Sequence, residues 1–373
     1  MRYFLISLFI FLTLSACSGN GSSAFINQET ECLPLHNPQS THQPLDKNAK
    51  ARKKQLETAE HWFYYLGFDP DKEVFQQIVV STYDLVVLEP IITERENTDF
   101  PIRQRVKELH NAAIPKIVLA YIDIGEAEEW RTYWQPDWHI GHPEFIQGDD
   151  PDGWEGNYPV AYWQDEWKDI WLKKDGILDQ LIAVGFDGVY LDWIEGYSDE
   201  SVIAAAEKDG VDAEHEMIRW VQDIAAHCRL NKPVFLIIGQ NAAELATHDN
   251  YFSTIDAISQ EQVWFDGGAD NQPPGDCPLP RSEAEVESAG YVSSLSPVCR
   301  HVYYQFPEST LHTSSEYYLT FLKSAQKNSK LIFTIDYALE PENIAWIYQT
   351  ARTLGFVPFV TERNVNTYLS PYP

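Results

Sequence analysis

The sequence predicts an α/β protein, a single-domain (β/α)8 barrel of the TIM type, and three observations predict it. Eight short apolar runs alternate with segments of helical periodicity over residues 48–373. No linker rich in Pro, Gly or Ser divides this body, and no repeat of fixed period occurs in it. No Gly-rich phosphate loop follows the first run, which argues against a doubly wound sheet, the alternative fold.

The N-terminal residues predict an exported lipoprotein. Residues 1–16 have the form of a signal peptide, with a positive Arg2 followed by the apolar stretch Tyr3–Leu14. That stretch is shorter than the roughly 20 residues that a membrane-spanning helix needs. The ending Leu14-Ser15-Ala16-Cys17 resembles a bacterial lipobox, which predicts lipidation of Cys17; cleavage as an ordinary signal peptide is the alternative. The protein is therefore expected in the bacterial cell envelope, lipid-anchored (in the outer membrane of a Gram-negative cell) or secreted.

Residues 17–47 are rich in Ser, Asn, Gln and Pro and predict a tether. Export also changes what the cysteines imply, because the four that remain once Cys17 is set aside are an even number, which favours disulfides in an oxidising compartment. Cys277 and Cys299 bracket a Pro-rich, acidic segment without secondary-structure pattern, so a disulfide between them would brace this insertion after the sixth strand. Cys32 would then pair with Cys228, although the sequence leaves three pairings open.

The predicted strands are short apolar runs, each closed by Gly or by a polar or acidic residue, a pattern typical of buried parallel strands. In order they are Trp62–Leu66, Tyr83–Leu88, Lys116–Ile124, Phe186–Leu191, Val234–Gly239, Ile255–Gln260, Leu331–Ile335 and Phe356–Val360. Helical periodicity predicts the helices between them, over Ile102–Ala113, Glu166–Val184, Ala213–Arg229, Ser314–Asn328 and Glu342–Leu354.

Polar residues stand at the ends of most of these strands. They are Glu89, Asp123 with Glu126, Asp192, Gln240 with Asn241, Glu261 and Asp336. One such acid is easily the cap of the following helix. Six strand ends of one barrel, however, converge on a single mouth, where ligands bind. Carboxylates packed that closely suppress each other's ionisation, which suits an acid–base pair.

The motifs narrow the chemistry. No G-x-S-x-G turn occurs, and the eleven His are scattered without an H-E-x-x-H pattern, so neither a serine nucleophile nor a metal site is predicted. Paired carboxylates remain, and they serve glycoside hydrolysis. Of twelve Trp, eight lie between Trp130 and Trp193, which suits stacking on sugar rings. Some recur every four residues, a helical spacing typical of core packing, so about three of the eight are expected to touch substrate.

The charge balance excludes some partners. The chain has 27 basic and 56 acidic residues, a formal net charge of −29. Such a surface repels nucleic acid and anionic lipid heads and attracts cations. A polycationic substrate would account for it, and solvation in a saline habitat is the alternative.

The chain resembles glycoside hydrolase family 114, the endo-α-1,4-polygalactosaminidases and their relatives. The resemblance rests on Ala120–Trp134, Tyr158–Trp167, Gly185–Trp193, Ile237–Leu245, Ile258–Phe265 and Phe333–Ala338, and it spans about Trp62 to Phe359. It implies a (β/α)8 barrel that acts on an α-1,4-linked galactosamine polysaccharide with no cofactor. The protein is expected to be a monomer. Asp192 would be the nucleophile of a retaining mechanism, staying ionised to attack, and Glu261 the general acid/base.

The same resemblance implies a set of residues on the walls of the substrate cleft. They are Tyr121, Asp123, Glu126, Arg131, Trp193, Asn241, Asp336 and Tyr337, of which Arg131 is equally explained as scaffold. The insertion over Asp276–Arg300 departs from the family pattern and leaves the exact sugar and the endo or exo mode open. The fourth-strand motif is also similar to that of glycoside hydrolase family 18, D-x-x-D-x-D-x-E. That family is excluded because Ile194 stands where its catalytic Glu should be. A non-catalytic polysaccharide-binding lipoprotein is the alternative from another class; it does not need both Asp192 and Glu261.

Overall fold

The structure is a computed structural model of the chain, and it describes residues 47–67, 72–151, 153–266, 276–307 and 309–373. These residues belong to one compact unit, Leu45–Pro373. The predicted signal peptide, the lipidation site Cys17 and nearly all of the tether lie outside the described residues. Among the described helices, none has the length and apolar character needed to cross a bilayer.

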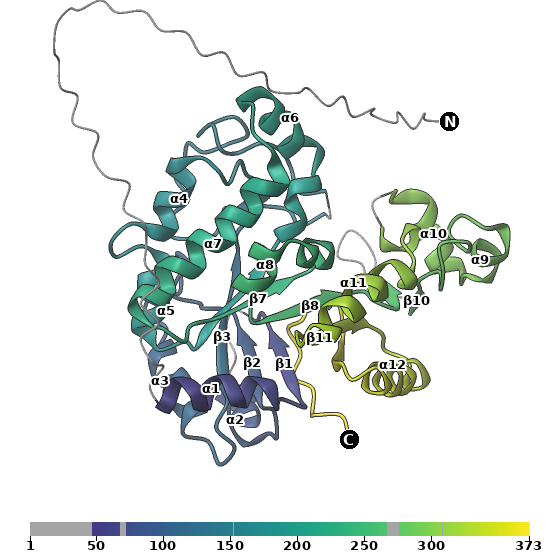
Figure 1. The fold of residues 1–373 in the computed structure, drawn as a ribbon, viewed down its shortest axis with the longest axis horizontal. Coiled ribbons are helices and arrows are strands. Elements are labelled where there is room, and N and C mark those ends of the chain that lie inside the picture. Colours follow the sequence, from purple (N-terminus) through teal and green to yellow (C-terminus); the bar gives the residue numbers. More distant parts are fainter. Residues whose placement is uncertain (1–46, 68–71, 152, 267–275, 308) are drawn as a thin grey trace, which may run out of the picture. The chain divides into compact units, whose positions relative to one another are not determined.

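Eight parallel strands form one nearly closed barrel, as the sequence predicts (Figure 1). In the order in which they pair, they are β1 (Trp62–Tyr65), β2 (Leu85–Leu88), β3 (Ile117–Asp123), β6 (Gly188–Asp192), β7 (Leu236–Gln240), β8 (Ala257–Glu261), β11 (Leu331–Tyr337) and β12 (Val357–Thr361). The first and last strands meet through Trp62, whose indole Nε1 donates to Val357 O (3.0 Å), and through Leu66 N, which donates to Val365 O (2.8 Å). Each predicted strand is confirmed, with ends that differ by at most two residues.

The barrel interior is packed with aromatic rings. Trp62 lies 5.3 Å from Phe333 and 5.7 Å from Phe359 between ring centroids, and Tyr64 lies 5.1 Å from Tyr190. These rings are almost fully buried. They fill the space between the strands and form a dry floor beneath the carboxyl ends of the strands.

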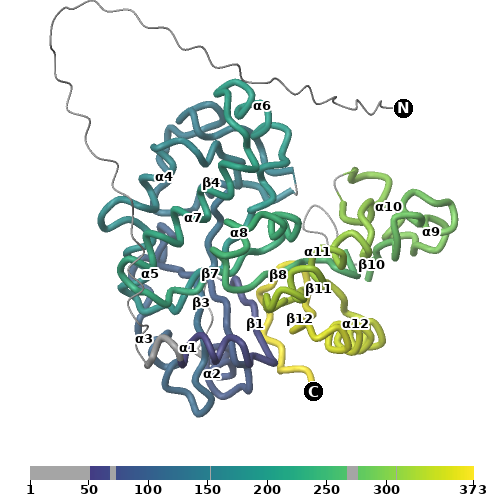
Figure 2. Tube along the Cα trace, viewed as in Figure 1, coloured from purple at the N-terminus to yellow at the C-terminus, as the bar shows by residue number. Residues whose placement is uncertain are grey.

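Most of the helices lie on the outside of the barrel, whereas the two helices over residues 289–305 lie apart from it in the insertion after β8 (Figure 2). In chain order the helices are α1 (Lys47–Glu57), α2 (Lys72–Val80), α3 (Ile102–His110), α4 (Asp165–Leu172), α5 (Ile177–Val184), α6 (Glu200–Asp209), α7 (Ala213–Asn231), α8 (Asp249–Thr254), α9 (Ala289–Ser294), α10 (Pro297–Gln305), α11 (Ser315–Lys327) and α12 (Pro341–Thr353). Short 3-10 turns lie at Ile194–Ser198, Ala243–Thr247 and Thr310–His312. The paired strands β4 (Glu126–Glu128) and β5 (Asn157–Pro159) form a small ribbon beyond β3.

One predicted helix is wrong in its length. The segment Glu166–Val184 is two helices, α4 and α5, because the chain turns between Leu172 and Ile177. Asp175 has a left-handed φ of 62°, and a side chain on Gly176 would meet Lys173 O and Trp171 O at 2.8 Å. The helix therefore cannot continue through this turn.

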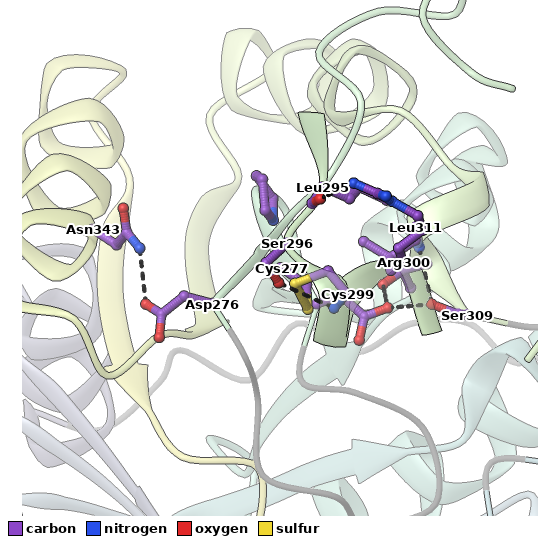
Figure 3. The surroundings of a disulfide bond; sticks show 12 residues. Asp276, Cys277, Leu295, Ser296, Cys299, Arg300, Ser309, Leu311 and Asn343 are labelled. Atoms are coloured by element: carbon purple, nitrogen blue, oxygen red, sulfur yellow. Dashed lines mark hydrogen bonds between the residues drawn. A yellow bond between two sulfur atoms is a disulfide. The ribbon is translucent and has the colours of Figure 1, made fainter. Parts of the chain in front are cut away.

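The insertion after β8 is a small module with its own core. β9 (Phe265–Asp266) pairs with β10 (Cys277–Pro278), and Cys277 is bonded to Cys299 on α10, with a Cα–Cα distance of 5.2 Å (Figure 3). This disulfide confirms the predicted pair. The prediction that the segment lacks secondary structure is wrong, since Ser288 and Ser296 cap helices α9 and α10.

Hydrogen bonds attach this module to the barrel. Within the module, buried Asp266 accepts from Ser309 Oγ (2.6 Å) and Thr310 Oγ1 (2.8 Å). Asp276 accepts from Asn343 Nδ2 (2.9 Å) and so joins the module to α12. Cys228 is a free thiol, fully buried on α7. The expected partner of Cys228, Cys32, lies outside the described residues.

Candidate active site

A cleft of about 1780 Å³ lies at the carboxyl ends of the barrel strands. Side chains from β1, β3, β6, β7, β8 and β11 line it, together with the β4–β5 ribbon and the inner edge of the insertion. Both predicted catalytic carboxylates, Asp192 and Glu261, lie in this cleft. They end β6 and β8, which are separated by β7 alone.

Asp192 is held by two donors from its own neighbourhood. The phenol of Tyr121, on the adjacent strand β3, donates to Asp192 Oδ2 at 2.6 Å. The backbone N–H of Trp193 donates to Oδ1 at 2.8 Å. Both carboxylate oxygens are thus fixed in one orientation.

Glu261 has a matching arrangement. The phenol of Tyr337, on the adjacent strand β11, donates to Glu261 Oε1 in a very short hydrogen bond. The amide of Asn241, at the end of β7, lies with Nδ2 3.4 Å from Glu261 Oε2, and its Oδ1 accepts from the Glu261 backbone N–H at 3.0 Å. Each of the two carboxylates therefore has one tyrosine donor on a neighbouring strand.

The expectation that Asp192 is fully ionised at neutral pH does not hold, because its surroundings raise its pKa. Burial and, after it, the charge of Glu261 raise the pKa of Asp192 to about 7, against the hydrogen bonds from Tyr121 and Trp193 N, which lower it. At neutral pH the side chain is thus poised between its acid and its carboxylate.

The turns after β6, β7 and β8 put these side chains in place. Trp193, Asn241 and Gln262 follow the three strands with left-handed φ values of 58°, 60° and 52°. Non-glycine residues in this region are uncommon and concentrate at functional sites. Gly125 has a different role, because a Cβ there would lie 2.3 Å from Trp193 O. Because glycine has no Cβ, the loop after β3 can lie against the end of β6.

Asp123 and Glu126 extend the acidic wall from β3. Asp123 is the register partner of Asp192, and its Oδ1 accepts from Gly125 N (3.0 Å) and Glu126 N (2.8 Å). Glu126 Oε2 accepts from Asn157 Nδ2 on β5 at 2.9 Å. Burial, followed by the charge of Asp192, raises the pKa of Asp123 well above its usual range; burial and the charge of Asp123 do the same to Glu126.

Two predicted wall residues lie behind the cleft. The guanidinium of buried Arg131 donates to Glu128 Oε2 (2.6 Å), to Glu128 Oε1 (2.9 Å), to Thr93 Oγ1 (2.9 Å) and to both oxygens of Glu89. It does not line the cleft, and with its donors engaged it acts as scaffold. Asp336 is fully buried as well, and its Oδ1 accepts from Trp264 N (2.7 Å) and Phe265 N (3.0 Å), which orders the chain after Glu261.

The other predicted wall residues all line the cleft: Tyr121, Asp123, Glu126, Trp193, Asn241 and Tyr337. Of the eight clustered tryptophans, Trp130, Trp154 and Trp193 do so. Trp167 and Trp171 are buried on α4, as their helical spacing predicts, whereas Trp130, Trp134 and Trp138 lie outside any helix.

Sequence reasoning missed several residues of the cleft. Tyr64, the third residue of β1, lines the floor of the cleft, and the aromatic run Trp62–Tyr65 gives no sign of which of its phenols does so. Glu195, in the turn after β6, stands three residues after Asp192, and that proximity was the available signal. Arg363, after β12, lies over the rings of Trp154 (5.5 Å) and Tyr337 (5.9 Å) at the rim.

The cleft is strongly acidic. Among the described residues that line it, two are arginines, Arg95 and Arg363, and one is a histidine, His312. The acids are Glu89, Glu94, Glu96, Asp123, Glu126, Glu128, Glu155, Asp192, Glu195, Asp199, Glu200, Glu244, Glu261 and Glu283. Such a concave surface focuses a negative potential on whatever enters it. Within the described ranges, no group of three or more His, Cys, Asp or Glu has an arrangement that could hold a metal ion.

Comparison with known proteins places these features in a family. The model of glycoside hydrolase family GH114 matches residues 46–372. An uncharacterised protein of Deinococcus radiodurans is 31% identical over 363 residues, 97% of either chain. Ega3 of Aspergillus fumigatus, solved with galactosamine, has a TM-score of 0.53 at 14% identity, covering 85% of this chain and 97% of Ega3. The glycoside hydrolase domain of PelA from Pseudomonas aeruginosa has a TM-score of 0.52 at 13% identity, covering 83% and 97%.

The contacts of Asp192 predict how its titration responds to substitution. Wild-type Asp192 should titrate with a pKa of about 7 in the free protein. Tyr121→Phe removes a hydrogen bond to the ionised form and should raise that pKa, whereas Glu261→Gln removes a neighbouring charge and should lower it. Carboxyl-carbon NMR titration of the three proteins measures these directions. Shifts of the same sign in both variants would contradict the assignment.

Proposed function

The chain belongs to glycoside hydrolase family GH114, and from that premise we propose that it hydrolyses a galactosamine-containing polysaccharide by a retaining, two-carboxylate mechanism. The observation on which the mechanism depends is the pair Asp192 and Glu261, each fixed by a tyrosine on a neighbouring strand. Retaining glycosidases need one carboxylate as nucleophile and a second carboxyl group as acid and base.

In the first step Asp192 Oδ attacks the anomeric carbon while the Glu261 carboxyl gives its proton to the leaving glycosidic oxygen. The bond from the anomeric carbon to that oxygen breaks, and a glycosyl ester on Asp192 forms. The dry aromatic floor beneath the cleft lowers the local dielectric, which strengthens the attraction between the carboxylate of Asp192 and the developing oxocarbenium ion.

In the second step Glu261, now ionised, takes a proton from water. That water attacks the anomeric carbon from the face that the leaving group vacated, and the ester bond to Asp192 breaks. Two displacements at one carbon retain its configuration. Tyr121 and Tyr337 remain hydrogen-bonded throughout and keep the two carboxyl groups on opposite sides of the bond that is cleaved.

The acidic lining of the cleft favours a cationic polymer. An unacetylated galactosamine carries an ammonium group at neutral pH, and the many lining carboxylates would attract it, whereas a neutral or anionic polysaccharide gains nothing from them. Ega3, which shares the fold, was solved with galactosamine. We therefore assign an α-1,4-linked galactosamine polysaccharide, bound by a monomer, as the substrate class.

The location of the protein is part of the proposal. The sequence Leu14-Ser15-Ala16-Cys17 supports lipidation of Cys17 after removal of residues 1–16. Residues 17–47 would then tether the barrel, residues 48–373, to the cell envelope. A lipid-anchored hydrolase would act on polysaccharide outside the cytoplasm, where the disulfide between Cys277 and Cys299 is stable.

Two shape-conserving substitutions test the catalytic assignment. Asp192→Asn removes the nucleophile and Glu261→Gln the proton donor, so each should lower turnover of partly deacetylated α-1,4-galactosaminogalactan by at least about 10²-fold with little change in thermal stability. Glu207→Gln, an exposed acid on α6 outside the cleft, is the matched charge control and should hydrolyse like wild type. Reducing-end assays report the rates. Near-wild-type turnover in either catalytic variant would show that the wrong carboxylate has been assigned.

The anchor is tested separately. Cys17→Ser removes the thiol that would be lipidated, so the variant should move from the membrane fraction to the soluble extract while the wild type stays with membranes. Immunoblots of fractionated cells measure this. If the variant remains as firmly membrane-bound as wild type, the lipoprotein assignment fails.

A further inference from the structure

A chain of side-chain hydrogen bonds links the ends of three successive strands beside the cleft. Glu195, just after β6, accepts at Oε1 from Asn241 Nδ2 on β7, at 2.5 Å. The same nitrogen lies 3.4 Å from Glu261 Oε2 on β8. The Asn241 amide thus stands between a carboxyl group with no role in the two displacements and the proposed general acid.

The other end of this amide is fixed. Asn241 Oδ1 accepts from the Glu261 backbone N–H and from Gln260 Nε2, both at 3.0 Å. Because a backbone N–H can only donate, Oδ1 must face it, which settles which end of the amide is oxygen. Asn241 also has a left-handed φ of 60°, so its backbone is confined to the turn after β7. The remaining freedom of the amide is a small swing of Nδ2 between Glu195 and Glu261.

The two distances show that Asn241 Nδ2 lies closer to Glu195 than to Glu261. At 2.5 Å the contact with Glu195 is short, whereas 3.4 Å to Glu261 is beyond the usual range of an N–H···O hydrogen bond. An N–H donated fully to Glu261 would stabilise its ionised form over its protonated form, so that less of it could donate a proton at neutral pH. Glu195 therefore draws away a donor that would otherwise oppose protonation of Glu261.

The surroundings of Glu195 indicate how it does so. Its Oε2 is buried and accepts no hydrogen bond from another described residue. The charged groups near Glu195 are Asp192 on β6 and Glu261 on β8, and the phenols near it are those of Tyr190 (β6), Tyr251 (α8) and Tyr318 (α11). Burial, followed by the charge of Asp192, raises the pKa of Glu195 well above its usual range. The hydrogen bond from Asn241 needs only the acceptor oxygen Oε1 of Glu195, and a glutamine also carries such an oxygen.

We propose that Glu195 is a positioning residue that holds the Asn241 amide away from Glu261 and so keeps Glu261 able to donate its proton. The inference rests on the proposed role of Glu261 as general acid. It concerns a residue that never touches the reacting atoms, and it acts through one hydrogen bond, the 2.5 Å contact between Glu195 and Asn241.

The test compares Glu195→Met with Glu195→Gln in the full-length enzyme. Met has similar volume but no acceptor, so Asn241 Nδ2 should move onto Glu261. The basic limb of the kcat/KM profile, which reports loss of the acid's proton, should then shift to lower pH by about one unit, and kcat should fall about tenfold with KM little changed. Gln keeps an acceptor oxygen, so the basic limb should stay at the pH of the wild type and kcat should stay within about threefold of the wild-type value.

Each outcome of these assays either supports or overturns the positioning role of Glu195. A basic limb that stays in place or moves to higher pH in Glu195→Met would overturn the proposal, as would an equal loss in Glu195→Gln, since that would mean the charge rather than the acceptor is needed. Should Glu195→Met unfold, Glu195→Leu is assayed in its place, and thermal melts of all variants confirm folding. Glu261→Gln distinguishes the two proposals: if it retains activity, the general-acid assignment itself has failed, whereas an inactive Glu261→Gln with an unshifted Glu195→Met sinks only the positioning role.

Discussion

The mutual repulsion of carboxylates in a dry barrel mouth is the constraint on which this structure depends. Parallel strands end at one rim, so their terminal acids are brought together and desolvated, and each must find donors or hold a proton. The molecule uses phenols and backbone N–H groups for the acids nearest the reaction: Tyr121 and Trp193 N for Asp192, and Tyr337 for Glu261. By contrast, Glu89 and Glu128 form ion pairs with a cation, the guanidinium of Arg131.

That division has a consequence for function. Neutral donors orient a carboxylate without cancelling its charge, so the cleft keeps its negative potential for a substrate that brings positive charge of its own. Burial, followed by the charge of Glu261, raises the pKa of Asp192. An ammonium group entering the cleft would favour the ionised carboxylate, so substrate binding and activation of the nucleophile would be coupled through electrostatics.

Local patterns predicted the barrel well, since each strand is a short apolar run closed by a polar residue. They also gave most of the site, because acids at strand ends share one rim. Local patterns failed for side chains whose positions are set by residues distant in the sequence. Arg131 engages Glu89, 42 residues away, and Asp336 turns toward the backbone after β8, neither of which periodicity reveals. Likewise the break at Gly176 and the bridge from Glu195 through Asn241 to Glu261 depend on close approach in space.

The most direct test of this account is to trap the covalent intermediate. A 5-fluoro glycosyl fluoride of galactosamine should glycosylate the enzyme, and mass spectrometry of the digested protein should place the sugar on the peptide that contains Asp192. The Glu261→Gln variant, with an activated leaving group, should still form this adduct and hydrolyse it slowly. Modification of another residue, or product of inverted configuration with no adduct at all, would contradict the mechanism.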